Sequence, residues 1–463
     1  MKQCFNDCSS LEEVIIESEI DTISDQLFKG CSSLKKIEIP SSVQVIGQLS
    51  FSDCSSLEKI TIPSSVTQLK RGCFSNCSSL KQIIIPPSVI RLEGNCFNSC
   101  SLLDQIIIPE SIKSLFDNCF ANCISLKKLT IPNSVKIING SCFYNCTSLE
   151  EIILPSKITK LLTGLFLKCT SLKKIQIPES TTEIKPFCFS KCTSLYEITI
   201  PETVKKIGQK CFSNCTSLTY VHNNSSVSEF QEQVFMDCKA LKSITINPLV
   251  NSINSLCFSN CKSLEIITIP SSVRFINKGC FMNCTSLYQI IICSTKITFG
   301  KEAFENCSSL TSVTLIADKK DISTDLNIKY KIEKQCFLNC TSLTEITIPL
   351  VRSINNFAFE GCSSLLEITI PSSVISIGNY AFNNCSSLAK ITILSPNIHL
   401  SESTFKNMNS LNEIYVHPDI YDDFGKKRTF YSIDGKCTIK QIEQRDLRLL
   451  YKNYPHFQLN KHT

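Results

Sequence analysis

One 23-residue pattern repeats almost from end to end of the chain, and this period constrains the fold more than any other feature. Each of the eighteen copies carries a Phe, and a Leu follows it six residues later. The step is 23 residues, except for 33 between Cys307 and Cys340 and 22 between Cys340 and Cys362. A short repeat cannot bury its own apolar side and must stack on its neighbours. The period therefore predicts a solenoid, although 463 residues would otherwise suggest about three globular domains.

The copy at residues 54–76, CSSLEKITIPSSVTQLKRGCFSN, shows how one coil is expected to fold. Alternating Ile60 and Ile62 predict a short strand with one buried face, and Pro63 ends it because proline cannot donate the next ladder hydrogen bond. The following segment points Val66 and Leu69 inward, from a turn or from a second short strand. Residues 70–76 are too few for a stable helix, so they predict one helical or 3₁₀ turn.

Two stretches carry a family resemblance: LEKITIPSSVTQLKRGCFSNCSSL at residues 57–80 and ITIPSSVISIGNYAFNNCSSL at residues 368–388. Both resemble the BspA-like leucine-rich repeats, a class named after a bacterial surface antigen. The resemblance covers roughly residues 4–416. It implies an α/β fold, a right-handed leucine-rich-repeat solenoid of about 18 coils with a parallel β-sheet on one face and short helical or 3₁₀ turns on the other. It also suggests a surface protein that binds host, matrix or cell-surface proteins.

The expected domain organisation is a solenoid over residues 1–416 followed by a C-terminal capping segment over residues 417–463. A polar insertion at 317–327 predicts a surface loop, either a tolerated insertion or a protruding contact loop. The segment from Thr438 to Asn453 has helical apolar spacing, so we expect an amphipathic helix that covers the last coil. No equivalent cap precedes Leu11 to Ile16, and this N-terminal sheet edge could self-associate.

The 29 cysteines allow three interpretations: buried structural thiols, scattered disulfides, or a metal or redox site. The odd number means that not all can pair, and the five His lie away from the Cys pairs of the repeats. One Cys column lies three residues after the Phe of each copy and is broken only by Met408. In a less strict column four residues earlier, Cys alternates with mostly small or apolar residues such as Ala303 and Val234. This pattern favours a buried reduced thiol, and at the stricter column we expect the thiol to donate to a loop carbonyl.

Outward positions of the predicted strand form a column that contains nine Thr and five Ile, flanked by Lys and Glu in near balance. The position three residues before this column alternates acidic and basic residues over the first eight copies, from Glu12 to Lys173, which predicts a self-neutralising surface. The alternative is a long Thr/Ile groove for an extended protein partner. Aromatic residues are enriched in binding hot spots, so a contact patch is expected in copies nine to thirteen. Its candidate residues are Tyr196, Thr199, Tyr220, His222, Thr245, Thr268 and Tyr288.

Several function classes find no support in the sequence. The net charge is only +6, and neither a basic column nor a row of stacking aromatics predicts nucleic-acid binding. No apolar run reaches a membrane span, and no single copy gathers a nucleophile, a base and an orienting group, so we expect no enzyme, metal or cofactor.

The remaining hypotheses both involve a protein ligand that the sequence does not identify. The first is a non-enzymatic surface antigen or adhesin, which the family resemblance favours. The second is an intracellular scaffold with the same fold. Its support is the absence of a signal-peptide pattern, which predicts a cytoplasmic location, together with the dense thiols, which favour a reducing compartment.

Overall fold

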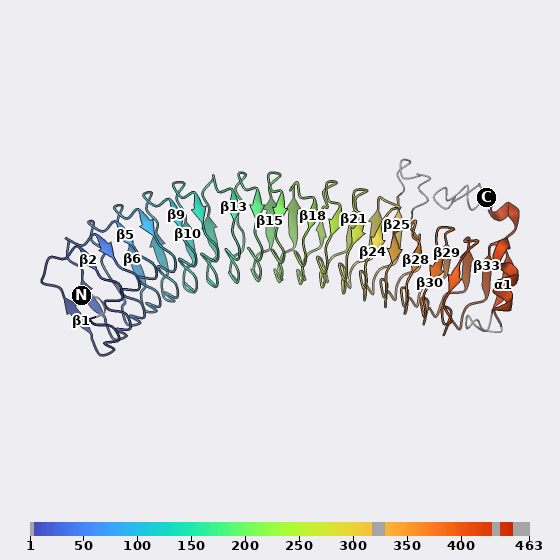
Figure 1. Ribbon diagram of the computed structural model, residues 1–463, viewed down its shortest axis with the longest axis horizontal. Coiled ribbons are helices and arrows are strands. Elements are labelled where there is room, and N and C mark those ends of the chain that lie inside the picture. Colours follow the sequence, from blue (N-terminus) through green and yellow to red (C-terminus); the bar gives the residue numbers. More distant parts are fainter. Residues whose placement is uncertain (1–3, 317–328, 428–435, 448–463) are drawn as a thin grey trace. The chain divides into compact units, whose positions relative to one another are not determined.

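The structure is a computed structural model and describes residues 4–316, 329–427 and 436–447. It contains two compact units, Met1–Ser226 and Val227–Thr463, and each is described by itself. Both units are built from stacked coils of about 23 residues (Figure 1), which confirms the predicted right-handed parallel solenoid. The insertion predicted at 317–327 lies outside the described residues. A boundary between a solenoid at 1–416 and a cap at 417–463 stays a prediction.

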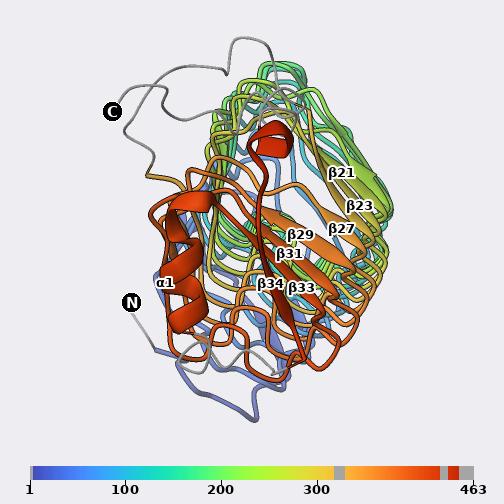
Figure 2. The ribbon, with the colours of Figure 1, turned by 90° about the vertical axis from the view of Figure 1, so that its right-hand side faces the viewer.

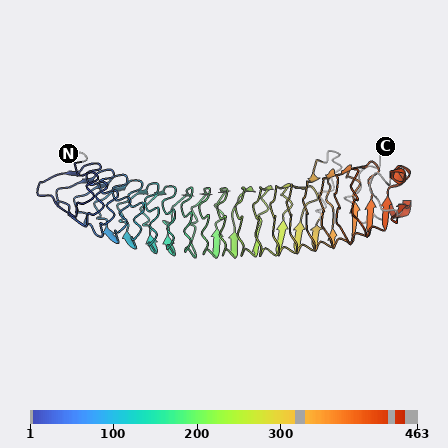
Figure 3. The ribbon, with the colours of Figure 1, turned by 90° about the horizontal axis from the view of Figure 1, so that it is seen from below.

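Most coils contain two short strands, here called the first and the second strand. The first strand comes from the Leu-x-x-Ile-x-Ile segment, and the second comes from the Val-x-x-Ile segment, so the second short strand considered as one possibility is present. Strands at equivalent positions in successive coils pair in parallel. Each residue pairs with the residue one repeat later, as Gln82 does with Gln105. Figure 3 shows the strands of unit 2 from yellow to red, side by side along one edge of the coils. The outward surface of the first strands is called the first-strand face below.

Unit 1 begins with residues 4–12 in turns. Its first strands are β1 (Glu13–Ile15), β3 (Lys36–Glu38), β6 (Gln82–Ile84), β8 (Gln105–Ile107), β10 (Lys128–Thr130), β12 (Glu151–Ile153), β15 (Glu197–Ile200) and β17 (Tyr220–Asn223). Its second strands are β2 (Thr22–Ile23), β4 (Val45–Ile46), β5 (Gln68–Leu69), β7 (Arg91–Leu92), β9 (Ser114–Leu115), β11 (Ile137–Ile138), β13 (Lys160–Leu161), β14 (Glu183–Ile184) and β16 (Lys206–Ile207).

Unit 2 continues the same alternation. Its first strands are β19 (Ser243–Ile244), β21 (Ile266–Ile269), β23 (Gln289–Ile292), β25 (Ser312–Leu315), β27 (Glu345–Ile346), β29 (Glu367–Ile370), β31 (Lys390–Ile393), β33 (Glu413–Val416) and β34 (Thr438–Gln441). Its second strands are β18 (Glu229–Phe230), β20 (Ser252–Ile253), β22 (Phe275–Ile276), β24 (Thr298–Phe299), β26 (Lys331–Ile332), β28 (Ser353–Ile354), β30 (Ser376–Ile377) and β32 (His399–Leu400). A 3₁₀ turn, η2 (Pro418–Ile420), and the helix α1 (Tyr421–Lys426) follow β33.

The third edge of each coil is a set of turns rather than a continuous helix. Hydrogen bonds of the 3₁₀ type are present, as from Cys73 N–H to the Lys70 carbonyl (3.2 Å). Residues two before and two after the core Phe adopt a left-handed conformation, as at Gly72 (φ 63°) and Asn76 (φ 61°). Left-handed residues interrupt an α-helix. The predicted helical turn is therefore limited to single 3₁₀-type turns.

Phe rings and thiols fill the interior behind these turns. Successive Phe rings stack at 5.4–5.8 Å between centroids from Phe5 to Phe212 in unit 1. In unit 2 the same stack runs from Phe235 to Phe405. Offset stacking of this kind adds to the free energy that burial of the rings supplies. One continuous column of rings therefore runs through each unit, as stacking requires.

The C-terminal segment differs from the prediction. Residues Thr438–Gln441, expected to begin a helix, form β34, which pairs in parallel with β33 (Figure 2). The physical reason is the open edge of β33, which offers backbone partners such as the Asn412 carbonyl, 2.7 Å from Thr438 N–H. Among the described residues from 438 onward, the helical ones are those at 444–447, and residues 448–453 of the predicted helix lie outside the described residues. Ile442 and Leu447 nevertheless pack on Leu394 and cover the end of the apolar interior.

Candidate functional site

The first-strand face presents one column of side chains to solvent. Strand residues alternate, so that in β6 the side chain of Ile83 is buried and those of Gln82 and Ile84 are exposed. Ile84 and Ile107 are 81% and 80% exposed on the paired strands β6 and β8. The Thr/Ile column predicted from the sequence is therefore an outward surface of unit 1, and several of its apolar members have no covering residues.

Four of the predicted contact residues lie in unit 1 on two neighbouring strands. Thr199 in β15 pairs with His222 in β17, and both side chains are exposed. Tyr196, directly before β15, and Tyr220, the first residue of β17, are 45% and 51% exposed. The structure thus brings these four residues together on one surface.

Hydrogen bonds between charged side chains link neighbouring coils in this part of unit 1. Glu197 receives hydrogen bonds from the ammonium of Lys174 (3.2 Å) and from the imidazole of His222 (3.2 Å). These contacts, the Lys174 hydrogen bond first, hold the pKa of Glu197 below its ordinary value. His222 therefore has a structural partner on the surface, and its position does not require a metal or a catalytic role.

The other three predicted residues lie in unit 2. Thr268 is an exposed member of β21 and pairs with Ile291 of β23. Tyr288, 42% exposed, precedes β23, and its backbone N–H donates to the Glu265 carbonyl (3.0 Å). Thr245 directly follows β19 and is exposed. Each unit thus carries part of the predicted patch, and a contact role for these residues stays a prediction.

Ion pairs between neighbouring coils neutralise much of the surrounding surface. In unit 1, Glu12 pairs with Lys35 and Glu58 pairs with Lys81, each at 3.0 Å. Glu150 pairs with Lys173 at 2.8 Å. The predicted alternation of charges therefore produces actual cross-strand pairs. Such exposed pairs contribute little to stability individually, but each neutralises two charges on this surface.

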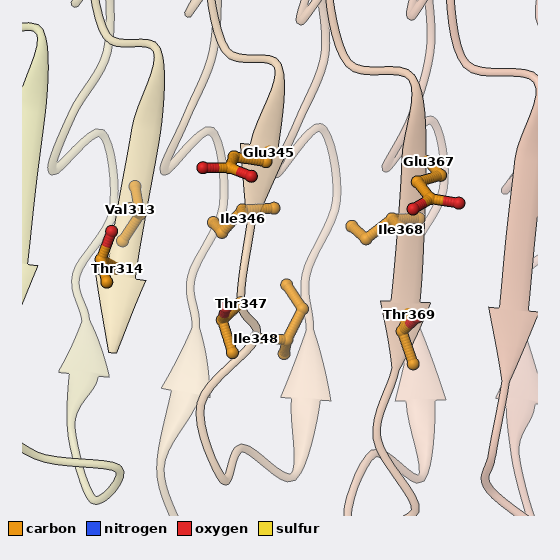
Figure 4. A pocket seen from close by; sticks show the side chains of 9 residues that line it. All are labelled: Val313, Thr314, Glu345, Ile346, Thr347, Ile348, Glu367, Ile368 and Thr369. Carbon is orange, nitrogen blue, oxygen red and sulfur yellow. The ribbon is translucent and has the colours of Figure 1, made fainter. Parts of the chain in front are cut away.

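A pocket in unit 2 was missed by the sequence analysis. It has a volume of about 240 Å³ and is open on the first-strand face at β25, β27 and β29. Figure 4 shows Glu345 and Glu367 at one level of the strands and the threonines Thr314, Thr347 and Thr369 at the next. The signal in the sequence was the 22-residue step, which shortens the coil that contains β27.

The cysteines form ladders of buried thiols. At the stricter column, the buried thiols donate to the carbonyl of the Phe in the preceding coil in both units, as from Cys215 Sγ to the Phe189 carbonyl (3.1 Å) and from Cys284 Sγ to the Phe258 carbonyl (3.1 Å). This confirms the expected bond to a loop carbonyl. Burial raises the pKa of Cys215 to about 12, so the neutral thiol persists at ordinary pH. All cysteines are free thiols, and of these only Cys4 and Cys8 are exposed.

Among the described residues there is neither a cluster of metal-ligating side chains nor a helix that could span a membrane. In residues 4–316, 329–427 and 436–447, no three His, Cys, Asp or Glu side chains are placed so that they could share a metal ion. Within the same ranges, no helix combines the length and the apolar character that crossing a membrane requires.

Comparison with solved structures gives relatives across most of the chain. A leucine-rich repeat protein from Bacteroides ovatus is 25% identical, with 93% of this chain and 92% of that chain covered and a TM-score of 0.48. A leucine rich cell surface protein from Faecalibacterium prausnitzii is 24% identical over 83% and 88% of the two chains, with a TM-score of 0.37. The pneumococcal vaccine antigen PcpA is 16% identical over 95% and 93%, with a TM-score of 0.30.

Comparison with curated proteins gives no significant match. The profile of the BspA type leucine rich repeat region, in six copies, matches residues 1–127, 113–242, 208–329 and 330–444. These matches span the coils of both units and agree with the repeat period, the paired strands and the Phe and Cys columns. The chain belongs to the BspA-type leucine-rich repeat family.

Proposed function

We propose that this protein is a non-enzymatic repeat protein that binds another protein through its first-strand face. The observation that carries the proposal is the set of large side chains left exposed at outward positions of that face. Tyr220 is 51% exposed and Tyr288 is 42% exposed, whereas the inward residues beside them are buried. Aromatic side chains bury much area at a low entropy cost, which is why they dominate interface energetics.

A role as a surface antigen or adhesin is the first form of this proposal, and family membership supports it. The ligand would then be a host, matrix or cell-surface protein. Labelling intact source cells with a membrane-impermeant biotin reagent tests this form. Labelling of intact cells is the expected result, and labelling only after lysis would exclude an adhesin.

An intracellular scaffold is the second form, and the buried free thiols support it. Nearly every coil places a reduced thiol in its interior, and reduced thiols persist best in a reducing compartment. Protein labelled only in lysed cells would favour this form over the first.

Substitution of the exposed tyrosines tests the binding face itself. Once a partner has been captured with the intact chain, Tyr220→Ala and Tyr288→Ala are each expected to weaken its affinity by about 1–2 kcal/mol, or roughly fivefold to thirtyfold. Truncation of an exposed ring leaves the interior unchanged, so the fold should persist. Calorimetric titration of the purified partner measures the change.

Phe275→Ala supplies the matched control. Phe275 is an aromatic residue of similar exposure (49%), but it lies on the second strand β22. Its truncation should leave affinity within twofold of the unchanged protein. Equal losses for Phe275→Ala and the two tyrosine variants, or no loss for either tyrosine, would show that the first-strand face is not the contact surface.

A further inference from the structure

Among the described residues, the first-strand ladder of unit 2 breaks between β19 and β21 and again between β27 and β29, and at the second break a hydrogen bond between the coils is missing as well. In the coils on either side of this second break, the residue after the core Leu donates its backbone N–H to its counterpart in the preceding coil, as from Thr344 to Thr311 (3.0 Å) and from Ala389 to Leu366 (3.0 Å). In the part of unit 2 that the structure describes, no such bond joins Leu366 to Thr344. Accordingly, β27 belongs to a ladder with β25, and β29 belongs to a ladder with β31.

The interruption is confined to the first strands. The same two coils remain joined by the pairing of β28 with β30 and by the hydrogen bond from Phe359 N–H to the Ala381 carbonyl (2.8 Å). The coil of β27 has one residue fewer between Pro349 and Val351 than the Pro-Ser-Ser-Val of a regular coil. The second strands and the turns of these two coils keep their spacing. The missing residue therefore affects the pairing of β27, the strand that precedes it.

The pocket of about 240 Å³ lies at this interruption. Ile346 on β27 is only half-buried, whereas its counterpart Ile368 on β29 is 3% exposed. The backbone carbonyl of Thr344 and the backbone N–H of Leu366 lack the partners that their counterparts have in neighbouring coils. The site therefore combines a recess with backbone groups that a ligand can satisfy.

Charge at the pocket is unbalanced. In the column that contains them, Glu345 and Glu367 are the one pair of carboxylates in neighbouring coils. Among the described residues, every other Glu in this column is in an ion pair, including Glu367 with Lys390 at 3.6 Å, but none is recorded for Glu345. Like charges on adjacent strands are unfavourable, and a cation between them would relieve the repulsion.

We propose that this pocket receives a lysine or arginine side chain of the protein partner. The inference rests on the proposed protein-binding function, because the cation is carried by that partner. The cationic head lies between the carboxylates of Glu345 and Glu367, where it gives Glu345 a counterion and reduces the repulsion between the two. Its methylene stem packs along Ile346, which lines the pocket and is only partly buried, while the threonine hydroxyls accept the remaining donors. The partner's backbone is in reach of the unpaired groups of Thr344 and Leu366.

Short peptides test the pocket without knowledge of the partner. The probes are a fluorescent, end-blocked pentapeptide with lysine at its centre and the same peptide with norleucine, which matches the stem but carries no charge. Binding to the full chain is measured by fluorescence anisotropy at low ionic strength. The lysine peptide is expected to bind about fivefold more tightly, in line with one partly exposed ion-pair site.

Two isosteric variants locate the effect. Glu345→Gln should reduce the preference for lysine to less than twofold. Glu265→Gln removes an exposed carboxylate from the same face of unit 2 away from the pocket and should leave the preference unchanged. Thermal unfolding of both variants checks that the fold is retained.

Equal binding of the two peptides, no binding of either, or an undiminished preference in Glu345→Gln overturns the inference. These outcomes do not affect the test of the binding face by the two tyrosine variants. Conversely, unchanged partner affinity in Tyr220→Ala and Tyr288→Ala would count against the proposed binding face, whatever the peptides show.

Discussion

The residue two positions after each core Phe shows how much a single position contributes to the coil. It is left-handed throughout, and Asn is its commonest occupant, as at Asn283 (φ 60°). The Asn283 amide donates to the Asn260 side chain (3.0 Å) and its oxygen accepts from Asn306 (3.0 Å). Asn tolerates this conformation better than other residues with a Cβ. The Asn of the recurrent Asn-Cys-Ser/Thr sequence is thus explained by backbone geometry and by a ladder between coils.

Replacement of Asn283 tests this account. Asn283→Ala should lower the free energy of unfolding by about 1–2 kcal/mol, because a left-handed Ala is strained and both ladder bonds are lost. Asn283→Gly should cost less, since glycine adopts the conformation freely. Urea unfolding followed by circular dichroism gives the comparison. As a control, Asn397→Ala at an exposed site should change stability by less than about 0.5 kcal/mol. An equal cost for Ala and Gly would contradict the role of the backbone.

At the scale of the elements, β34 shows that apolar spacing in the sequence does not always predict the secondary structure. The apolar spacing of residues 438–453 fits a helix, yet Thr438–Gln441 pairs with β33 because the last coil exposes unpaired backbone groups. Ile442 and Leu447 then cover Leu394. A terminal coil needs such a cover, since it has no neighbour to bury its interior.

Truncation of Leu447 tests the cover. Leu447 is 6% exposed, so Leu447→Ala should destabilise the end of unit 2 locally by about 2 kcal/mol. Hydrogen exchange of the β33 and β34 amides should accelerate, while amides of unit 1 stay unchanged. Leu249→Ala, at a residue that is 57% exposed, is the control and should alter neither. Unchanged exchange in β33 after Leu447→Ala would mean that this contact does not stabilise the terminal strands.

At the scale of the whole molecule, the buried thiols of both units act together. Burial raises the pKa of Cys146 and Cys307 to about 12, from an ordinary value of 9.0. Because the pKa is raised in the folded state, this contribution to stability is complete below pH 9. It is lost as the pH rises, since only the unfolded chain can then ionise its thiols.

Alkaline unfolding should therefore be abrupt. Each deeply buried thiol favours the unfolded state by about 1.4 kcal/mol per pH unit above 9, and about ten of them exceed a typical net stability of 5–15 kcal/mol. We expect the β-sheet circular dichroism to disappear between about pH 9 and 11, together with the appearance of thiolate ultraviolet absorbance. An intact spectrum at pH 11 would contradict a reduced, buried thiol core.

The coil, its period and the residues of its interior could be predicted from the amino-acid sequence alone. Leu57, Ile60, Val66, Phe74 and Cys77 could each be assigned to the core, because stacking of identical coils demands the same apolar columns in every copy, and all five are buried. The candidate tyrosines could be predicted to be exposed from strand alternation alone. Family membership followed from the same columns.

Features that depend on contacts between particular coils could be seen only in the tertiary structure. The left-handed turns, the strand β34 and the interruption between β27 and β29 each arise from backbone groups that find, or fail to find, partners one coil away. The step of 22 residues is visible in the sequence, but the sequence does not show which edge of the coil loses its pairing. That depends on how strongly the other two edges are hydrogen-bonded to the neighbouring coil. In unit 2 those two edges hold, and the first-strand face opens beside Glu345.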